Sequence, residues 1–103
     1  MFNQLGFHPE ALSEYSEAAS CYLEQASPLV ADALLDAVES AIAVVVLDPT
    51  RWRIVEAPEI RRCVVRHFPF VIYYRWEASH RRVTIYSLMH CSREPGYWSH
   101  RVG

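Results

Sequence analysis

The chain has 103 residues, of which 51% are hydrophobic and 21% charged, so we expect residues 1–103 to form one globular domain. It contains no run of about 18 apolar residues and no basic segment leading into an apolar one, which argues against a membrane span and a secretory signal. The three cysteines are widely separated and argue against a disulfide framework, so we expect a cytoplasmic protein.

Charge is divided unevenly along the chain, although the formal net charge is only −2. Residues 1–50 contain eight acidic residues and no Lys or Arg, whereas residues 51–103 contain ten Arg and four Glu. Arg is the residue best suited to bidentate binding of a carboxylate or a phosphate. The division predicts an acidic helical face and a basic sheet-side face. A basic half fits an acidic protein segment as well as nucleic acid, so charge alone does not identify the partner.

The first half of the chain predicts a short strand followed by two helices. Residues 2–7 form the strand, and Pro9 is favourable in the first turn of the helix after it. Ser27-Pro28 is an N-cap followed by a proline at the first helical position, so a second helix begins there and ends before Asp48. The apolar positions at helical spacing are Leu12, Tyr15, Ala19, Tyr22, Leu23 and Ala26 in the first helix, and Val30, Ala33, Leu34, Ala37, Val38, Ala41, Ile42 and Val45 in the second. The pair predicts a helical hairpin.

The second half predicts three antiparallel strands at residues 60–67, 70–76 and 82–90, which are rich in Val, Ile, Tyr, Phe and Trp. Residues 77–80 form the turn between the last two strands, and an irregular tail begins at Cys91. One sheet face is predicted to carry Phe70, Ile72, Tyr74, Trp76, Val83, Ile85 and Met89. Packing the hairpin on that face gives an α+β fold with two layers and the order β-α-α-β-β-β.

The segment HCSREPGYWSH at 90–100 suggests a metal site or a Cys–His pair at first sight, but its spacing favours neither. Structural zinc sites use close ligand pairs. His90 and Cys91 are adjacent, so in a strand they point to opposite faces, and His100 has no partner at short spacing. A Cys–His nucleophile here lacks a third orienting group. We therefore expect no metal and no cofactor.

Arginines in the second half are candidates for binding an anion. Phosphate chemistry needs clustered cations and a group that moves a proton. The cations would be Arg61, Arg62, Arg66, Arg93 and Arg101, and the proton-transfer groups His67, His90 and Tyr97. Strand periodicity puts Arg62 and Arg66 on one face and Arg61 on the other. The alternative is a solvated face on which Arg stems cover apolar surface. Trp98 either pins the tail to the core or belongs to a binding surface.

Four segments together carry a resemblance that covers nearly the whole chain. They are FHPEALSEYSEAASCYLEQ at 7–25, AVESAIAVVVLDPTRW at 37–52, RRCVVRHFPFVIYY at 61–74 and HCSREPGYWSHR at 90–101. In this order they resemble the RelE/ParE superfamily of toxins from type II toxin–antitoxin pairs. The resemblance implies a cytoplasmic growth inhibitor, neutralised by a cognate antitoxin in a toxin–antitoxin hetero-oligomer. It also implies docking of the antitoxin on the apolar hairpin grooves and on Arg62, Arg66 and Arg93.

Two activities occur among proteins that the chain resembles. RelE-like members are ribosome-dependent endonucleases that cut mRNA, and ParE-like members inhibit DNA gyrase. The resemblance to the ribonucleases puts Arg62, Arg93 and Tyr97 at catalytic positions, but it puts Val64, Val71 and Cys91 where they carry basic residues. Losing that charge removes electrostatic stabilisation of a phosphoryl transition state. We therefore predict a ParE-like gyrase inhibitor, with an RNA-cutting toxin acting on the ribosome and mRNA as the alternative. In either case Arg61, Arg66, His90, Trp98 and Arg101 are predicted binding residues.

Overall fold

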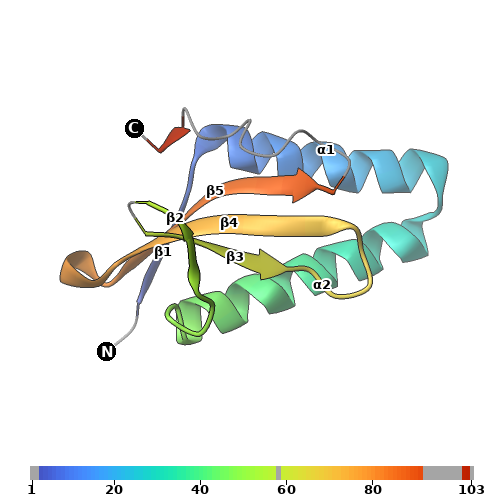
Figure 1. The fold of residues 1–103 in the computed structure, drawn as a ribbon. Helices are drawn as coiled ribbons and strands as arrows, with labels where there is room; N and C mark the ends of the chain where they lie inside the picture. Colours follow the sequence, from blue (N-terminus) through green and yellow to red (C-terminus); the bar gives the residue numbers. More distant parts are fainter. Residues whose placement is uncertain (1–2, 58, 92–100, 103) are drawn as a thin grey trace.

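The computed structural model describes residues 3–57, 59–91 and 101–102. Along the chain the elements are β1 (Gln4–Phe7), α1 (Pro9–Gln25), α2 (Pro28–Leu47), β2 (Ile54–Glu56), β3 (Ile60–Val64), β4 (Phe70–Glu77), the 3₁₀ helix η1 (Ala78–His80) and β5 (Arg82–His90) (Figure 1). The predicted α+β fold is confirmed, and β2 is added to the predicted order. Among the described residues no helix is long and apolar enough to span a membrane.

Both helices begin where the sequence predicts. The Nδ1 atom of His8 accepts a hydrogen bond from the Glu10 amide at 3.2 Å, and Pro9 follows as the first helical residue. The hydroxyl of Ser27 accepts one from the Val30 amide at 3.1 Å at the start of α2. These side chains satisfy amide donors that have no partner within the helix, which fixes where each helix starts.

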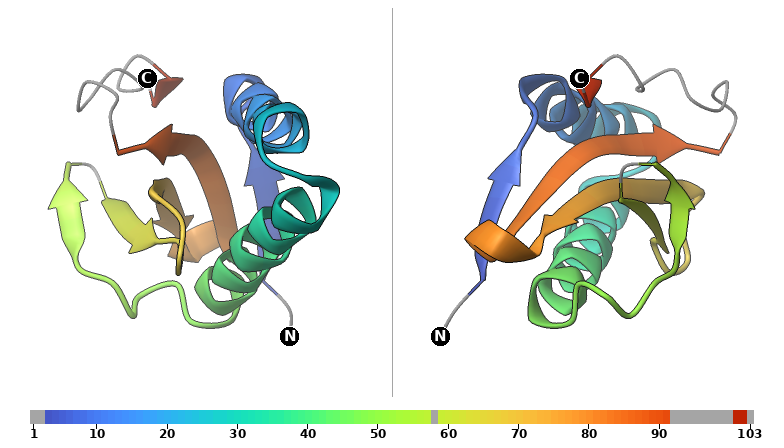
Figure 2. Two further views of the ribbon diagram at one scale, coloured as in Figure 1. Left: turned by 90° about the vertical axis from the view of Figure 1, so that its right-hand side faces the viewer. Right: turned by 60° about the vertical axis from the view of Figure 1, so that its left-hand side comes forward.

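The five strands form one sheet in the order β1-β5-β4-β3-β2. β1 runs parallel to β5, with Gln4 beside Arg82, and the other neighbouring pairs are antiparallel. The helical hairpin covers one face of this sheet, so the molecule has two layers (Figure 2). The first strand therefore pairs with the last strand. The two helices, which follow β1 in the sequence, pack on one face of the sheet.

The main core lies between the sheet and the hairpin. Its buried members include Phe70, Ile72, Tyr74, Val83, Ile85 and Leu88 from the sheet, and Leu34, Val38, Ile42 and Val45 from α2. The predicted sheet face is thus confirmed, with Trp76 at its margin. Met89 was wrongly assigned to this face. The register shifts between Tyr73 and Tyr74, so Tyr86 is an extra residue in β5 and Met89 packs on the opposite face.

The apolar stripe predicted for α1 is only partly right. Ala11 and Ala18 are the buried residues of this helix, and Tyr15 and Tyr22 pack against the core from its margin. Leu12 and Leu23, which the stripe included, are 50% and 53% exposed. The helix approaches β5 closely through small side chains, and its larger apolar side chains lie to either side of that contact.

Two strand boundaries also differ from the prediction. β3 ends at Val64, and residues 66–67 form a turn in which His67 has a φ of 69°. Strand periodicity therefore does not extend to Arg66, so the prediction that it shares a strand face with Arg62 is wrong. β2 was missed because it has three residues, all exposed, at the sheet edge.

Candidate functional site

The helix-free face of the sheet carries the central residue of the predicted cationic cluster. Arg62 is exposed there and lies beside Tyr73 of β4, which lies beside Ser87 of β5. A second, smaller apolar cluster lies on this face and comprises Ile60, Val71, Tyr73, Tyr86 and Met89, with Val102 packed against it. Arg62 is therefore an exposed cation next to a buried apolar cluster.

Two of the three positions at which the ribonuclease resemblance calls for basic residues, Val64 and Val71, lie in one apolar row on this face. Val64 of β3 lies directly beside Val71 of β4, and Val71 lies beside Met89 of β5. Val64 is 57% exposed, whereas the other two are buried. Cys91 follows the end of β5, is exposed, and donates its amide to the Pro69 carbonyl at 2.8 Å. Of the three residues of this row only Val64 is accessible to a partner, and the row carries no positive charge.

Arg75 is a further cation on the helix-free face, in addition to the arginines predicted to bind an anion. It lies between Ile60 of β3 and Thr84 of β5 and is partly buried. Its Nε atom is buried and has no hydrogen-bond acceptor among the described residues. The signal was available, because Arg75 is two residues beyond Tyr73 on the same strand and period two puts both on one face.

Arg61 points to the other side of β3, as predicted, and takes part in internal contacts. Its guanidinium donates to the Trp52 carbonyl and lies 4.0 Å from a Glu59 carboxylate oxygen, with the side chain 11% exposed. The Tyr74 hydroxyl donates to the Pro49 carbonyl at 2.7 Å. These two hydrogen bonds hold the loop between α2 and β2 against the sheet.

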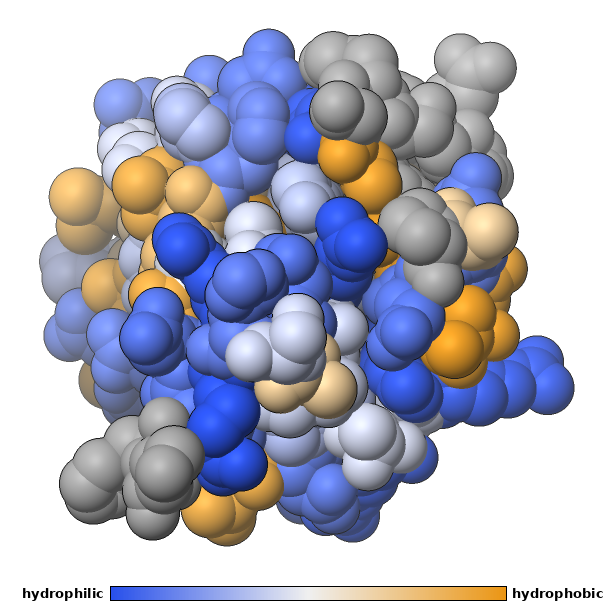
Figure 3. Space-filling model, turned by 90° about the vertical axis from the view of Figure 1, so that its left-hand side faces the viewer, coloured by the Kyte–Doolittle hydropathy of each residue, from blue (hydrophilic) through white to orange (hydrophobic). Residues whose placement is uncertain are grey.

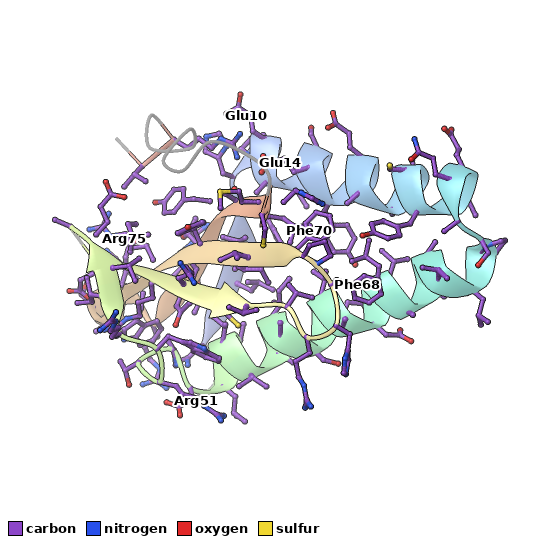
Figure 4. The ribbon with its side chains drawn as sticks, turned by 45° about the vertical axis from the view of Figure 1, so that its right-hand side comes forward. Glu10, Glu14, Arg51, Phe68, Phe70 and Arg75 are labelled. Atoms are coloured by element: carbon purple, nitrogen blue, oxygen red, sulfur yellow. The ribbon has the colours of Figure 1, made fainter. Side chains whose placement is uncertain are left out.

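Arg101 lies at the edge of β5 and not on the exposed face of the sheet. Its side chain is 7% exposed, and its guanidinium lies 2.8 Å from a Glu14 carboxylate oxygen and 2.9 Å from a Glu10 oxygen. It also donates to the Tyr86 carbonyl at 3.0 Å, while Glu14 accepts from the Leu88 amide at 3.3 Å. Figure 4 shows both glutamates on α1 next to this edge.

The Glu14–Arg101 ion pair binds backbone groups at the edge of β5 that a neighbouring strand would otherwise bind. β1 pairs with β5 only as far as Ile85, and beyond that point the edge groups of β5 would otherwise have no strand to bind. Unpaired backbone groups at a sheet edge favour pairing with another chain. The Glu14–Arg101 pair satisfies one carbonyl and one amide of that edge with side chains.

Two further predicted binding residues lie within the described part of the chain: Arg66 is exposed in the turn after β3, and His90 ends β5. Its ring lies 5.1 Å from the Phe70 ring, with the two planes nearly perpendicular. It lines a groove of about 530 Å³ between α1 and the end of β5, which also contains Cys21 and Tyr22. Arg93, Tyr97 and Trp98 lie outside the described residues, so their predicted roles remain predictions.

The cysteines and histidines of the described residues bear on the metal and Cys–His alternatives. No group of three or more His, Cys, Asp or Glu side chains within the described ranges could hold a metal ion. Cys63 is 2% exposed, and burial raises the pKa of its thiol to about 11, against the smaller opposing effect of Arg51. A thiol with a raised pKa is a poor nucleophile at neutral pH.

An apolar groove of about 680 Å³ lies between β1, α1 and α2, and we call it the hairpin groove. Its lining includes Leu5, Phe7, Leu12, Tyr15, Val46 and Leu47. Leu47 is 84% exposed and Leu12 is 50% exposed, so large apolar side chains face solvent here. Figure 3, which faces the end of the molecule carrying η1, shows hydrophobic side chains gathered at the left, on the helix side of the sheet.

The polar groups of the hairpin groove are few. Tyr15 donates its hydroxyl to a Glu39 carboxylate oxygen at 3.4 Å. Burial raises the pKa of Tyr15, and the negative charges of Glu39 and Asp36 raise it further. Arg81 lines the groove as well. A wide apolar floor with few polar groups fits the apolar face of an amphipathic helix.

Comparison with known proteins gives a consistent assignment. Residues 5–95 match the family described as the ParE toxin of the type II toxin–antitoxin system parDE. The fold is similar to a structure described as the chromosomal ParDE TA system from P. aeruginosa, with 14% identity, a TM-score of 0.74, and coverage of 86% of this chain and 96% of that one. It is also similar to the isolated E. coli RelE toxin, with 17% identity, a TM-score of 0.62, and coverage of 97% and 95%.

A doubly mutated E. coli RelE in the free state is similar as well, with 17% identity, a TM-score of 0.63, and coverage of 89% of this chain and 86% of that one. No curated protein sequence matches the chain. At these identities the likeness to solved structures establishes the fold, while the family match covers most of the chain.

Proposed function

Because the chain belongs to the ParE toxin family of type II toxin–antitoxin systems, we propose that it arrests bacterial growth by inhibiting DNA gyrase in the cytoplasm. A toxin of this class has a cognate antitoxin as its partner. The proposed inhibition is a binding event and requires no bond to be broken by the toxin itself.

The observation that supports gyrase over messenger RNA is the apolar row on the helix-free face. Val64 and Val71 are cross-strand neighbours, and Met89 continues the row. A ribonuclease needs cations around the scissile phosphate, since electrostatic stabilisation supplies much of the rate of phosphoryl transfer. Two adjacent valines in that place supply none. The exposed Val64, with the exposed Arg62 two residues before it on the same face of β3, suits contact with a protein.

The test combines two assays on one preparation of the purified chain. In the first, gyrase supercoils relaxed plasmid while the toxin is titrated in, and both the loss of supercoiling and the appearance of linear plasmid are scored. In the second, ribosomes translate a defined messenger with the same toxin concentrations, and primer extension detects cleavage. We expect inhibited supercoiling with intact messenger. Cleaved messenger with unaffected gyrase would assign the chain to the RNA-cutting class.

A variant separates specific inhibition from non-specific effects. Arg62→Gln removes the exposed cation of the helix-free face, and Arg53→Gln makes the same charge change in the exposed segment before β2. If the helix-free face contacts gyrase, the first change weakens inhibition by about three- to tenfold, a typical value for one interface cation, and the second leaves it unchanged.

We further propose that the antitoxin binds the hairpin groove through an amphipathic helix. The groove exposes leucines that a folded protein normally covers, and its floor is almost entirely apolar. Burying a Leu side chain contributes about 1.5–3 kcal/mol, so two such side chains account for a large part of a tight complex.

The chain offers a matched pair of variants for this proposal. Leu47 is 84% exposed and lines the groove, while Leu29 is 80% exposed and is not among the groove residues. Leu47→Asp is expected to weaken antitoxin binding at least tenfold by isothermal titration calorimetry, and Leu29→Asp to change it less than twofold. Equal effects of the two substitutions would show that the antitoxin binds elsewhere.

A further inference from the structure

A second groove lies on the other flank of α2 and differs from the hairpin groove in charge. It has a volume of about 630 Å³ and runs between α2, the loop that follows it, and the end of β3. We call it the Trp52 groove, after the indole that lines it together with Ala37, Ala41, Val44, Arg51 and Arg66. The α2 residues of the two grooves do not overlap, so α2 is a ridge between them.

The floor of the Trp52 groove is apolar and made of small side chains. Ala37 and Ala41 lie one helical turn apart on α2 and are partly buried, and the Cys63 thiol lies beneath them in the core. Val64, which is 57% exposed on the helix-free face of β3, borders the groove at its outer edge. Small residues on a helix permit close approach of a second helix, because the side chains of the second helix pack into the space above the small residues.

The first cation of this groove is held in place by the loop after α2. The Arg51 guanidinium lies 5.6 Å from the centre of the Trp52 ring, within range of a cation–π interaction. Trp52 packs edge-on against Tyr74 at 6.3 Å, and its carbonyl accepts a hydrogen bond from Arg61. Arg51 therefore projects from a supported loop, as Figure 4 shows, and loses less conformational freedom on binding than a mobile side chain.

The second cation comes from the turn between β3 and β4. Arg66 lines the groove from there, next to His67, whose backbone is in the left-handed region at φ 69°. That conformation is unfavourable for a residue with a Cβ atom, and such strain tends to occur where a fold holds functional side chains. Within the described residues neither Arg51 nor Arg66 forms an ion pair.

The acidic residues of α2 at the Trp52 groove favour a peptide over a nucleic acid as the ligand of this groove. Asp36 lines the same groove, and Asp32 lies one helical turn before it on α2, so a continuous phosphate backbone would meet like charge along the helix. A helix with apolar residues on one face and a few carboxylates on its flanks meets no such repulsion. Its apolar face fits the floor of the groove, and its carboxylates reach Arg51 and Arg66.

We propose that the Trp52 groove binds an acidic amphipathic segment of a protein partner, at a site separate from the hairpin groove. The two guanidiniums pair with carboxylates of that segment, and Trp52, Ala37 and Ala41 contact its apolar face. Because the two grooves flank one helix, a single partner chain that crosses α2 can occupy both.

The experiment measures fluorescence anisotropy of a labelled 16-residue helical peptide with Leu on one face and Glu on the other, titrated with the full chain. A peptide with Gln in place of each Glu serves as the neutral probe, and a single-stranded RNA oligonucleotide of equal charge as the nucleic-acid probe. Arg51→Gln combined with Arg66→Gln removes both groove cations. Arg53→Gln combined with Arg82→Gln makes the same charge change at exposed arginines outside the groove.

We expect the acidic peptide to bind about tenfold more weakly to the groove double variant and less than twofold more weakly to the control double variant. Binding to wild type should also weaken with added salt. Leu47→Asp, which alters only the hairpin groove, should leave the charge-dependent part of binding unchanged. Absence of binding, equal losses in both double variants, or equal binding of the neutral peptide would overturn the proposal. Tighter binding of the RNA, lost in the groove variant, would replace it with a nucleic-acid site.

Discussion

The ion pair at the edge of β5 gives the most direct test of how this small fold is held together. Glu14 accepts hydrogen bonds from the Arg101 guanidinium at 2.8 Å and from the Leu88 amide and the Ser87 hydroxyl, each at 3.3 Å. Its side chain is 15% exposed and that of Arg101 is 7% exposed. Glu14→Gln keeps the size of the side chain and one acceptor oxygen, but it removes the charge that faces Arg101.

The expected loss follows from these contacts. Removing one member of a fully buried pair costs about 3–5 kcal/mol, because the other charge stays buried alone. Here Glu10, 53% exposed, remains 2.9 Å from Arg101 and compensates part of that loss. We therefore expect the free energy of unfolding to fall by about 2 kcal/mol. With a urea m-value of about 1–2 kcal/mol/M, the midpoint falls by at least about 1 M.

The assay is urea unfolding followed by circular dichroism for wild type, Glu14→Gln, Arg101→Gln and the double variant. The cycle isolates the interaction between the two side chains, and we expect a coupling energy of about 1.5 kcal/mol. Glu17→Gln, an exposed position one turn further along α1, is the control and should change stability by less than about 0.5 kcal/mol. A coupling energy below about 0.5 kcal/mol would refute the reasoning, because it is the value of a solvent-exposed pair.

Three further changes test other parts of the structure. Tyr74→Phe removes the donor to the Pro49 carbonyl and should lower the free energy of unfolding by about 1–2 kcal/mol in the same urea assay, without altering the far-ultraviolet spectrum. Burial raises the pKa of Cys63 from 9.0 to about 11, so its thiol stays neutral in the folded state while the unfolded thiol ionises. The unfolding free energy should be unaffected by this group below pH 9 and fall by about 1.4 kcal/mol per pH unit between pH 9 and 11, and Cys63→Ala should remove that slope. Burial also raises the pKa of Tyr74, so a second decline that Tyr74→Phe abolishes should begin above pH 10. His67→Gly removes the side chain from a residue whose backbone is left-handed at φ 69°, so the free energy of unfolding should rise by roughly 0.5–1 kcal/mol in the same urea assay. A decrease would show that the contacts of the His67 side chain stabilise the fold more than the backbone strain destabilises it.

The helices and most of the sheet could be predicted because their signals are local. Ser27-Pro28 specifies the start of α2 through one side-chain hydrogen bond and one restricted backbone angle. Alternation along β4 puts Phe70, Ile72 and Tyr74 on one face, and the structure confirms it. The resemblance to the RelE/ParE superfamily is confirmed as well.

The parts that could not be predicted depend on contacts between distant segments. The extra residue at Tyr86 shifts the alternation of β5 and moves Met89 to the opposite face, and no composition signal marks it. Arg101 and Glu14 are 87 residues apart in the sequence, so nothing near Arg101 indicates that its charge is neutralised internally. The apolar pattern of α1 predicts that its leucines are buried. In the structure the alanines are buried instead, because α1 packs closely against β5.

The parallel pairing of β1 with β5 also determines when this protein can fold. Among the described strands Gln4–Phe7 is made first, and its neighbour in the sheet is made last. At about 5–20 residues per second, synthesis of 103 residues takes roughly 5–20 s. Until residues 82–90 emerge, β1 has no strand to join and the inner face of the hairpin lacks part of its sheet. The sheet is therefore complete only once residues 82–90 are available, and a fragment that stops before β5 cannot join its first strand to the rest of the sheet.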